Sequence, residues 1–204
     1  MSTTHCTRTP FGLTLLNSQH PDIRRLKRQN PTQLHGNKTW NASYLLMDYL
    51  QQNPLALHSQ VVDIGCGWGL SGIFCAKHFA AEVVAVDADP AVFPYLQLHA
   101  EYNNVDIQTQ QALFDEITID ELQGFDYLIA ADICFWDEMA DSVYELIARA
   151  CEAGIGKIII ADPQRPPFLA MADRCAETFY GEIIPAGIDK PRKTRGALLV
   201  IENR

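Results

Sequence analysis

The sequence lacks the patterns by which metal sites and membrane spans are recognised. Its six cysteines form no C-x-x-C pair and no spacing that suits zinc, and its six histidines are scattered singly. We therefore expect reduced, buried thiols and no metal. Its apolar runs are only as long as strands, and residues 1–12 lack a basic start followed by an apolar core. We expect a cytoplasmic protein with no secretory signal and no membrane span.

Positive charge is also scarce, with 16 Lys and Arg against 25 Asp and Glu and a formal charge of -9. This balance argues against a nucleic-acid partner, because proteins that bind nucleic acids nonspecifically neutralise the phosphates with a large basic surface. Two basic clusters, at residues 24–28 and 190–195, are the exceptions. Each is typical of a solvated surface, and an acidic partner would suit them only if both lie on one rim.

What is present is a chain of 204 residues, the size of one domain, in which predicted strands alternate with helices. We expect residues 1–35 to be an irregular N-terminal segment and residues 36–204 to form the domain. Apolar spacing predicts a leading helix from Trp40 to Leu50. Further strands are predicted at 61–64, 82–89, 105–111, 125–133 and 157–162, and further helices at 70–79, 90–102, 137–151 and 167–179.

The pattern changes after the last of these helices, where residues 182–188 and 196–202 are β-rich and separated by a short basic segment. This arrangement predicts a hairpin. The expected fold class is α/β: a single Rossmann-like domain with a mostly parallel seven-stranded sheet, helices on both faces and an antiparallel C-terminal hairpin strand.

A glycine-rich loop follows the first strand of this predicted sheet. It fits the dinucleotide pattern G-x-G-x-x-G from Gly67, and also the pattern D-x-G-x-G-x-G of S-adenosylmethionine sites from Asp63. A buried acid pointing into the loop would repel a pyrophosphate, whereas it suits the ammonium and sulfonium groups of a methionine portion. We therefore favour S-adenosylmethionine over NAD. The predicted loop contacts are Asp63, Gly65, Cys66, Gly67, Trp68 and Gly69.

Asp87 ends the next strand, where an acid can accept hydrogen bonds from both ribose hydroxyls of an adenosine. This feature serves either cofactor. The chain leaves little length for a separate substrate domain, and the terminal hairpin also argues against a dehydrogenase. An NAD-dependent oxidoreductase and a catalytically silent cofactor-binding module remain the less favoured alternatives.

The similarity to known proteins extends beyond the loop. Trp40 and the leucine-rich helix after it, then VVDIGCGWGLSGI, VVAVDADP, FDYLIAADICFW and IIIADPQRP, resemble the family 16 methyltransferases, class I enzymes known mainly for protein-lysine methylation. Within that group the sequence resembles the branch of the electron-transfer-flavoprotein β-subunit lysine methyltransferase and its bacterial relatives. The resemblance covers about residue 36 to the C-terminus. It implies S-adenosyl-L-methionine as cofactor and a protein lysine as methyl acceptor.

The resemblance also implies an acceptor site after the fourth strand. The family has an aspartate, two apolar residues and a tyrosine there, and this chain has Asp132 with Phe135 in place of the tyrosine. We expect Asp132 to orient an amine, and the aromatic faces of Phe135, Trp136 or Trp40 to stabilise the methylated cation. The turn at 162–167 resembles a D-P-P-Y motif but follows the wrong strand, so we interpret it as a rigid turn in which Arg165 pairs with an acid.

The remaining expectations concern the cofactor. Trp40 is expected to cover its methionine end, and Trp68 to narrow the entrance. The predicted contacts to the adenosine part are Asp87, Leu113 and Phe114, and Ala88 and Ala131 are further predicted cofactor contacts. A small-molecule N-methyltransferase uses the same loop and remains the main enzymatic alternative, although the sequence has no large insertion of the kind that forms a lid.

Overall fold

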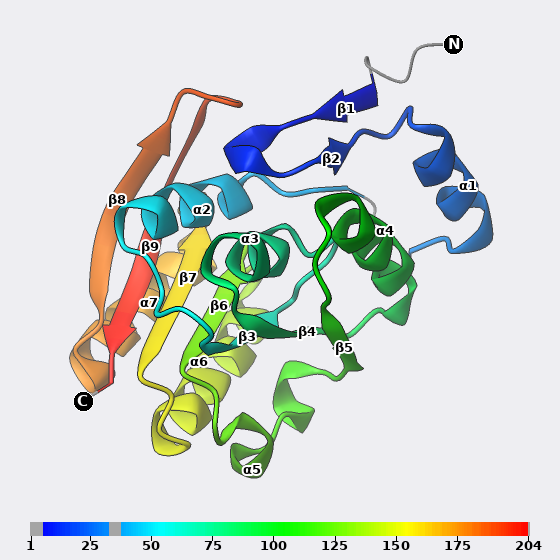
Figure 1. The fold of residues 1–204 in the computed structure, drawn as a ribbon. Coiled ribbons are helices and arrows are strands. Elements are labelled where there is room, and N and C mark those ends of the chain that lie inside the picture. The colour runs from blue at the N-terminus through cyan, green and yellow to red at the C-terminus, as the bar shows by residue number, and fades with distance from the viewer. Residues whose placement is uncertain (1–5, 33–37, 204) are drawn as a thin grey trace.

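The computed structural model describes residues 6–32 and 38–203, and its centre is a seven-stranded sheet (Figure 1). The strand order is β5-β4-β3-β6-β7-β9-β8. The parallel strands are β3 (Gln60–Ile64), β4 (Glu82–Asp87), β5 (Gln108–Gln111), β6 (Tyr127–Ala131) and β7 (Lys157–Asp162). Strand β9 (Thr194–Glu202) pairs antiparallel with β7, and β8 (Glu182–Ile188) pairs antiparallel with β9. The predicted fold class is confirmed.

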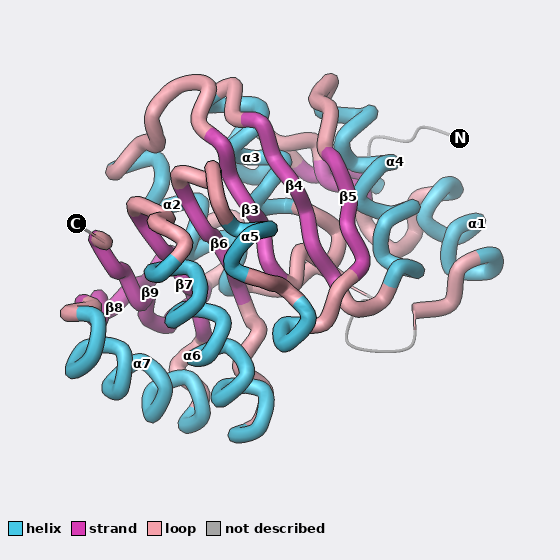
Figure 2. Tube along the Cα trace, turned by 90° about the horizontal axis from the view of Figure 1, so that it is seen from below, coloured by secondary structure: helices cyan, strands magenta, loops and turns pink. Residues whose placement is uncertain are grey.

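Helices cover both faces of this sheet (Figure 2). One face carries α2 (Ala42–Gln52), α3 (Leu70–Phe79) and α4 (Phe93–Asn103), and the other carries α5 (Ile119–Leu122), α6 (Asp137–Glu152) and α7 (Pro166–Phe179). Short 3-10 turns stand at Pro10–Gly12, Pro90–Val92 and Phe114–Glu116. The predicted helix at 70–79 is confirmed at both ends, and the leading helix begins two residues later than predicted.

The central strands are apolar along their length because both of their faces are covered. Alternate residues enter different cores: Val61, Ile129 and Ile159 belong to the cluster under α2 and α3, whereas Val62 and Leu128 belong to the cluster under α6 and α7. Strand β5 lies at the edge and is polar, and it begins at Gln108 rather than at the predicted residue 105. Because these five strands run parallel, their carboxyl ends lie at one edge of the sheet.

The expectation of an irregular N-terminal segment is wrong for residues 6–32. Strands β1 (Thr7–Arg8) and β2 (Leu15–Leu16) form a small antiparallel pair, and helix α1 (Pro21–Gln29) follows. The segment is ordered because Leu15, Leu16 and Ile23 are buried in the same core as α3 and α4. Residues 1–5 and 33–35 of the predicted segment lie outside the described residues, and the division of the chain at residue 36 remains a prediction.

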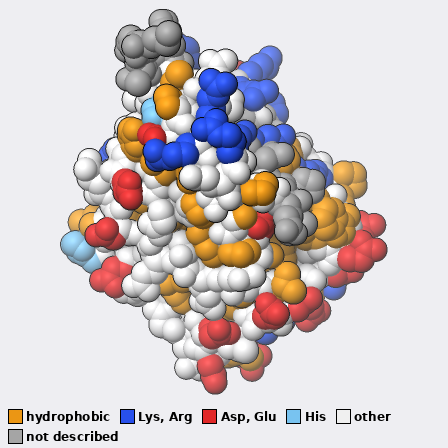
Figure 3. All heavy atoms as spheres, turned by 90° about the vertical axis from the view of Figure 1, so that its right-hand side faces the viewer, with side chains coloured by type: hydrophobic (Ala, Val, Ile, Leu, Met, Phe, Trp, Pro, Cys, Tyr) orange, Lys and Arg blue, Asp and Glu red, His pale blue; other side chains and the backbone are white. Residues whose placement is uncertain are grey.

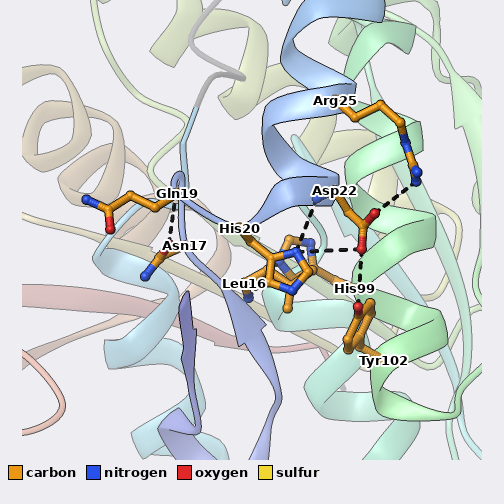
Figure 4. A network of polar contacts seen from close by, with 8 residues as sticks. All are labelled: Leu16, Asn17, Gln19, His20, Asp22, Arg25, His99 and Tyr102. Atoms are coloured by element: carbon orange, nitrogen blue, oxygen red, sulfur yellow. Dashed lines mark hydrogen bonds and ion pairs between the residues drawn. The ribbon is translucent and has the colours of Figure 1, made fainter. Parts of the chain in front are cut away.

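Polar contacts join this segment to α4 (Figure 4). The backbone N–H of Leu16 donates to Nε2 of the buried His99 at 3.2 Å, and the hydroxyl of Tyr102 donates to Asp22 at 3.2 Å. Asp22 also pairs with Arg25 at 3.1 Å. At the start of α1, the ring of His20 accepts the N–H of Asp22. Because buried backbone groups need partners, α4 completes the hydrogen bonding of the hairpin.

The two basic clusters of the sequence lie apart. Residues 24, 25, 27 and 28 are exposed on α1. Figure 3 views the molecule from the side on which α1 lies in Figure 1, and it shows Lys and Arg side chains gathered in the upper part of this view. The second cluster lies in the turn between β8 and β9, at the other end of the sheet (Figure 1). The strand register places this turn beyond the carboxyl end of β7, and Lys27 of the first cluster lies over the ring of Trp68 in the glycine loop, so both clusters lie toward the carboxyl edge of the sheet. None of the described helices is long and apolar enough to cross a membrane.

Candidate active site

The glycine loop after β3 adopts a conformation that requires its glycines. Gly65, Gly67 and Gly69 have φ of 63°, 52° and 74°, in the left-handed region that other residues rarely adopt. A Cβ on Gly65 would lie 2.5 Å from Cγ2 of Ile133, and a Cβ on Gly69 would lie 2.5 Å from Cγ of Leu96. The loop thus needs glycine for its backbone angles at three positions, and for space at two of them.

Two carboxylates accept backbone N–H groups, one from this loop and one from the helix after it. Oδ2 of Asp63 accepts the N–H of Gly72 in the first turn of α3, at 2.9 Å, and Oδ2 of Asp87 accepts the N–H of Gly67, also at 2.9 Å. Burial raises the pKa of Asp63 to about 7, and burial also raises the pKa of Asp87. The second oxygen of Asp87 accepts the N–H of Asp89 at 3.0 Å. Asp63 therefore binds the first turn of α3, whereas Asp87 binds the loop itself.

A cavity of about 380 Å³ opens at this carboxyl edge of the sheet. Its size lies within the range of roughly 300–1,000 Å³ that is usual for ligand pockets. The strand order explains its place, because β3 stands between β4 and β6 and the ends of all three meet there. The predicted site residues that line it are Trp40, Gly65, Gly67, Asp87, Ala88, Leu113, Phe114, Ala131, Asp132, Phe135 and Trp136.

Five further residues line the cavity that sequence reasoning missed: Asp115, Ile133, Glu138, Met139 and Ser142. Glu138, Met139 and Ser142 lie on the first turns of α6, which follows the acceptor segment. Their spacing places them along one side of the helix. Helices that only lie at the surface have the same pattern, so the spacing does not by itself indicate a site. Ile133 stands between two predicted residues, and its side chain touches the loop at Gly65. Only adjacency to the motif pointed to these residues.

Four predicted cofactor residues do not line the cavity: Asp63, Cys66, Trp68 and Gly69. The expectation that Trp68 narrows the entrance is wrong. Its side chain is buried and stacks on Tyr95, with ring centroids 4.9 Å apart, and on His99 at 5.5 Å. Because the loop turns at Gly67 and Gly69, the intervening side chain points toward α4. Burial also raises the pKa of Cys66, whose Sγ lies 3.8 Å from the carbonyl oxygen of Gly67.

Asp132 stands at the end of β6 with both carboxylate oxygens engaged. Oδ1 accepts Nη2 of Arg165 at 2.8 Å, and Oδ2 accepts the N–H of Ala42 at the start of α2, also at 2.8 Å. Arg165 also pairs through Nη1 with Asp162, so its predicted pairing with an acid is confirmed and involves two acids. The carboxylate that we expected to orient an amine is therefore already bound within the chain.

Aromatic side chains form the wall next to Asp132. The rings of Trp40 and Phe135 lie edge to face with centroids 5.1 Å apart, and the Arg165 guanidinium carbon lies 4.4 Å above the Phe135 ring. The ring centroid of Trp136 lies 6.1 Å from that of Phe135, and Trp136 is 43% exposed. On the other side of the cavity Leu113 is exposed, and its backbone N–H donates to Glu116 at 2.8 Å. Leu113 thus offers its side chain to a ligand, while its N–H is already used.

The residues fit S-adenosylmethionine better than a dinucleotide. Asp87 presents carboxylate oxygens where ribose hydroxyls need acceptors, and Leu113 and Phe114 supply apolar faces suited to an adenine ring. Asp115 and Glu138 add further acidic groups to the lining. Several carboxylates around one cavity would repel a pyrophosphate but attract a ligand with an ammonium and a sulfonium. S-adenosylmethionine supplies an electrophilic methyl group when it is bound in such a site.

In fold, loop and cavity the protein is similar to the class I S-adenosylmethionine-dependent methyltransferase domains. Comparison with known proteins agrees, because residues 61–154 match the family model of a methyltransferase domain. The electron transfer flavoprotein beta subunit lysine methyltransferase of Danio rerio is 28% identical over 130 residues, which are 63% of this chain and 50% of that protein. The chain spans about half the length of the curated relatives it matches.

Solved structures have the same fold at low sequence identity. The precorrin-6y C5,15-methyltransferase of Geobacter metallireducens GS-15 superposes with a TM-score of 0.64 at 11% identity, over 87% of this chain and 95% of that one. The tRNA (uracil-54, C5)-methyltransferase of Pyrococcus abyssi, solved in complex with S-adenosyl-L-homocysteine, gives 0.63 at 19% identity, over 95% of this chain and 42% of that one. These similarities concern the fold alone.

Proposed function

We propose that this chain transfers the methyl group of S-adenosylmethionine to an amine nitrogen, the side chain of a lysine in a partner protein. The observation that carries the proposal is the position of Asp132 and its aromatic neighbours at the cavity that the glycine loop borders. The similarity to lysine methyltransferases of the electron transfer flavoprotein beta subunit supports the choice of acceptor. The resemblance to that branch of the family 16 enzymes points the same way.

Each part of the cavity has a role in this proposal. Asp87 and Ala88 hold the ribose, Leu113 and Phe114 flank the adenine, and the glycines allow the methionine part to approach the backbone. Trp40, Phe135 and Trp136 surround the acceptor nitrogen, where aromatic faces stabilise a methylated cation. Methyl transfer from a sulfonium is a direct displacement, so these residues act by aligning the neutral nitrogen behind the methyl carbon.

The acceptor choice has a basis in the shape of the site. Trp136 is a large apolar side chain that is 43% exposed and lines the cavity. Exposed apolar groups at the mouth of a site are suited to covering the aliphatic part of a protruding side chain. A protein lysine has this form, with an aliphatic stem and an amine at its end. We infer that the methyl acceptor is presented by a folded partner.

Calorimetric titration with S-adenosylmethionine, S-adenosylhomocysteine and NADH tests the cofactor first. We expect saturable binding of the two methionine-derived ligands, lowered at least about 100-fold in Asp87→Ala, because hydrogen bonds to a charged group contribute about 1.5–3 kcal/mol each. Asp106→Ala is the matched control, since Asp106 is an exposed acid outside the cavity. Binding of NADH alone would contradict the proposal.

A second experiment tests the acceptor. The protein is incubated with S-adenosylmethionine carrying a labelled methyl group and a cell lysate, and labelled proteins are mapped by mass spectrometry. We expect the label on lysine side chains. Label that appears only in the small-molecule fraction would instead support the alternative of a small-molecule N-methyltransferase.

A further inference from the structure

Two carboxylates and one guanidinium meet between the ends of β6 and β7. Arg165 joins Asp132 through Nη2 and Asp162 through Nη1, and its backbone N–H donates to Asp162 Oδ1 at 2.8 Å. Asp132 and Asp162 are buried, with 4% and 0% of their surfaces exposed. With both acids ionised, this cluster carries two negative charges and one positive charge. The net charge of the cluster is then -1.

The same cluster supports one wall of the cavity. The Arg165 guanidinium covers the ring of Phe135, which contacts Trp40 edge to face. Asp132 also holds the first N–H of α2 at Ala42, two residues after Trp40. Arg165 does not line the cavity. Its influence on the cavity therefore passes through Asp132 and Phe135.

We propose that Arg165 is a positioning residue of the acceptor site: by bridging Asp132 and Asp162 it holds the wall of Trp40 and Phe135 in place and leaves one negative charge uncompensated, which selects an acceptor that arrives as a cation. This inference rests on the proposed function and narrows it. An amide or a nucleobase has no such charge, whereas a lysine side chain brings an ammonium. Its proton leaves to solvent before the nitrogen can react.

The proposal predicts a pH dependence. Burial raises the pKa of Asp162 to about 6, although Arg165 opposes that shift. The charged or titratable groups that face Asp162 are Arg165 on its own turn, Asp132 at the end of β6, and Cys134. Strand β9 places the apolar Ala197 beside it. Below about pH 6 Asp162 is protonated, Arg165 balances Asp132, and the net charge of the cluster is zero, so the affinity for a cation is lost as the pH falls.

The test uses n-butylammonium as a probe, with 1-butanol as its neutral counterpart, on protein saturated with S-adenosylhomocysteine. The chain has three tryptophans. Trp40 and Trp136 line the cavity, while Trp68 stacks on Tyr95 and serves as an internal reference. NMR signals of the three indole N–H groups report binding. We expect n-butylammonium to shift the signals of Trp40 and Trp136 but not of Trp68, with an affinity at least about tenfold higher than that of 1-butanol.

The variant Arg165→Lys keeps the charge but loses the fork that reaches two carboxylates at once. We expect the affinity for n-butylammonium to fall about tenfold, with S-adenosylhomocysteine binding changed by no more than about twofold. Arg174→Lys is the matched control. Arg174 lies on α7 and, like Arg165, pairs with an acid, Asp141, and stacks on an aromatic ring, that of Tyr144. Its n-butylammonium affinity should equal that of the wild type.

Asp162→Asn gives a readout that a purely structural role would not change. It removes the titrating group, so the loss of n-butylammonium binding near pH 6 should disappear and the affinity at pH 8 should fall about tenfold. Equal affinity for n-butylammonium and 1-butanol, or an unchanged affinity in Arg165→Lys, would overturn the proposal while leaving the proposed function intact. Failure of S-adenosylhomocysteine to bind would count against the proposed function itself.

Discussion

At the scale of single residues, Asp132 has a backbone conformation that its neighbours must hold in place. Its φ is 61°, in the left-handed region that Asp and Asn adopt more readily than other non-glycine residues. The carboxylate in turn accepts the N–H of Ala42 and the Arg165 guanidinium. The residue thus joins the end of β6, the start of α2 and the turn after β7. A substitution of Asp132 therefore affects both the backbone conformation and the carboxylate. The new side chain must tolerate the positive φ if the loss of the charge is to be tested alone.

Asp132→Asn separates the two roles. Asparagine tolerates the positive φ and still accepts the N–H of Ala42, but it has no charge for Arg165 or for an amine. We expect the variant to fold, to bind S-adenosylhomocysteine within about twofold of the wild type, and to lose methyl transfer by at least about 100-fold. Asp141→Asn, at an exposed ion pair with Arg174, is the control. Unchanged transfer by Asp132→Asn would remove Asp132 from the mechanism.

Asp63 predicts an unusual pH dependence of stability. Its pKa is about 7 in the folded protein, against about 3.9 in an unfolded chain, so the folded state holds the proton more tightly. The stability from this group is full below about pH 4 and is lost as the pH rises toward 7. In Asp63→Asn this loss is absent. Without cofactor, we expect the variant to gain about 2–3 kcal/mol on the wild type between pH 5 and pH 8.

Urea unfolding at the two pH values measures this difference. A constant difference between variant and wild type would mean that Asp63 titrates normally. Comparing variant with wild type at each pH cancels the contributions of other acids, including Asp87 and Asp162.

At the scale of elements, the β1-β2 hairpin depends on α4. Oδ1 of Asn103 accepts the N–H of Thr14 at 2.7 Å, and its Nδ2 donates to the carbonyl oxygen of Thr14 at 2.9 Å and to that of His99 at 2.7 Å. One buried amide thus pairs both backbone groups of Thr14. The hairpin strands have two residues each, too short to be stable alone.

Asn103→Ala should therefore loosen the hairpin. Leaving the partly buried backbone groups of Thr14 without partners costs about 1–2 kcal/mol of folding free energy. Amide hydrogen exchange should become faster at Thr14 and Leu16 but not in β3. Glu101→Ala, on the exposed side of the same helix, should change stability by less than about 0.5 kcal/mol. Unchanged exchange at Thr14 would show that hydrophobic burial alone holds the hairpin.

At the scale of the whole molecule, burial decides which thiols can react. Cys75, Cys134 and Cys175 are buried, and burial raises the pKa of each thiol. Because the thiolate is the reactive form, these three should not react with an aromatic disulfide reagent in the folded protein, and all six cysteines should react in denaturant. Cys6, which is partly exposed, should react first. Rapid reaction of Cys75 would show that the core opens easily.

Local patterns in the sequence were enough to predict the sheet, the loop and the acids at the strand ends. The apolar runs of β3, β6 and β7 and the spacing of Gly65, Gly67 and Gly69 depend on neighbouring residues only. Ten of the eleven predicted site residues that line the cavity lie at or after the ends of β3, β4, β5 and β6, which the strand order brings together, whereas Trp40 lies before α2. The N-terminal hairpin was missed because Leu16 meets its partner His99 across 83 positions.

The sequence by itself therefore determined the α/β fold, the antiparallel hairpin at its end and the type of cofactor. Only the tertiary structure decided that Trp68 points to α4, that Leu113 has used its N–H, and that Asp132 is bound to Arg165. These are outcomes of side-chain direction and of contacts between distant segments. The physical reason is that hydrophobic period and glycine spacing act over a few residues, whereas the partner of a buried charge is chosen by the packed molecule.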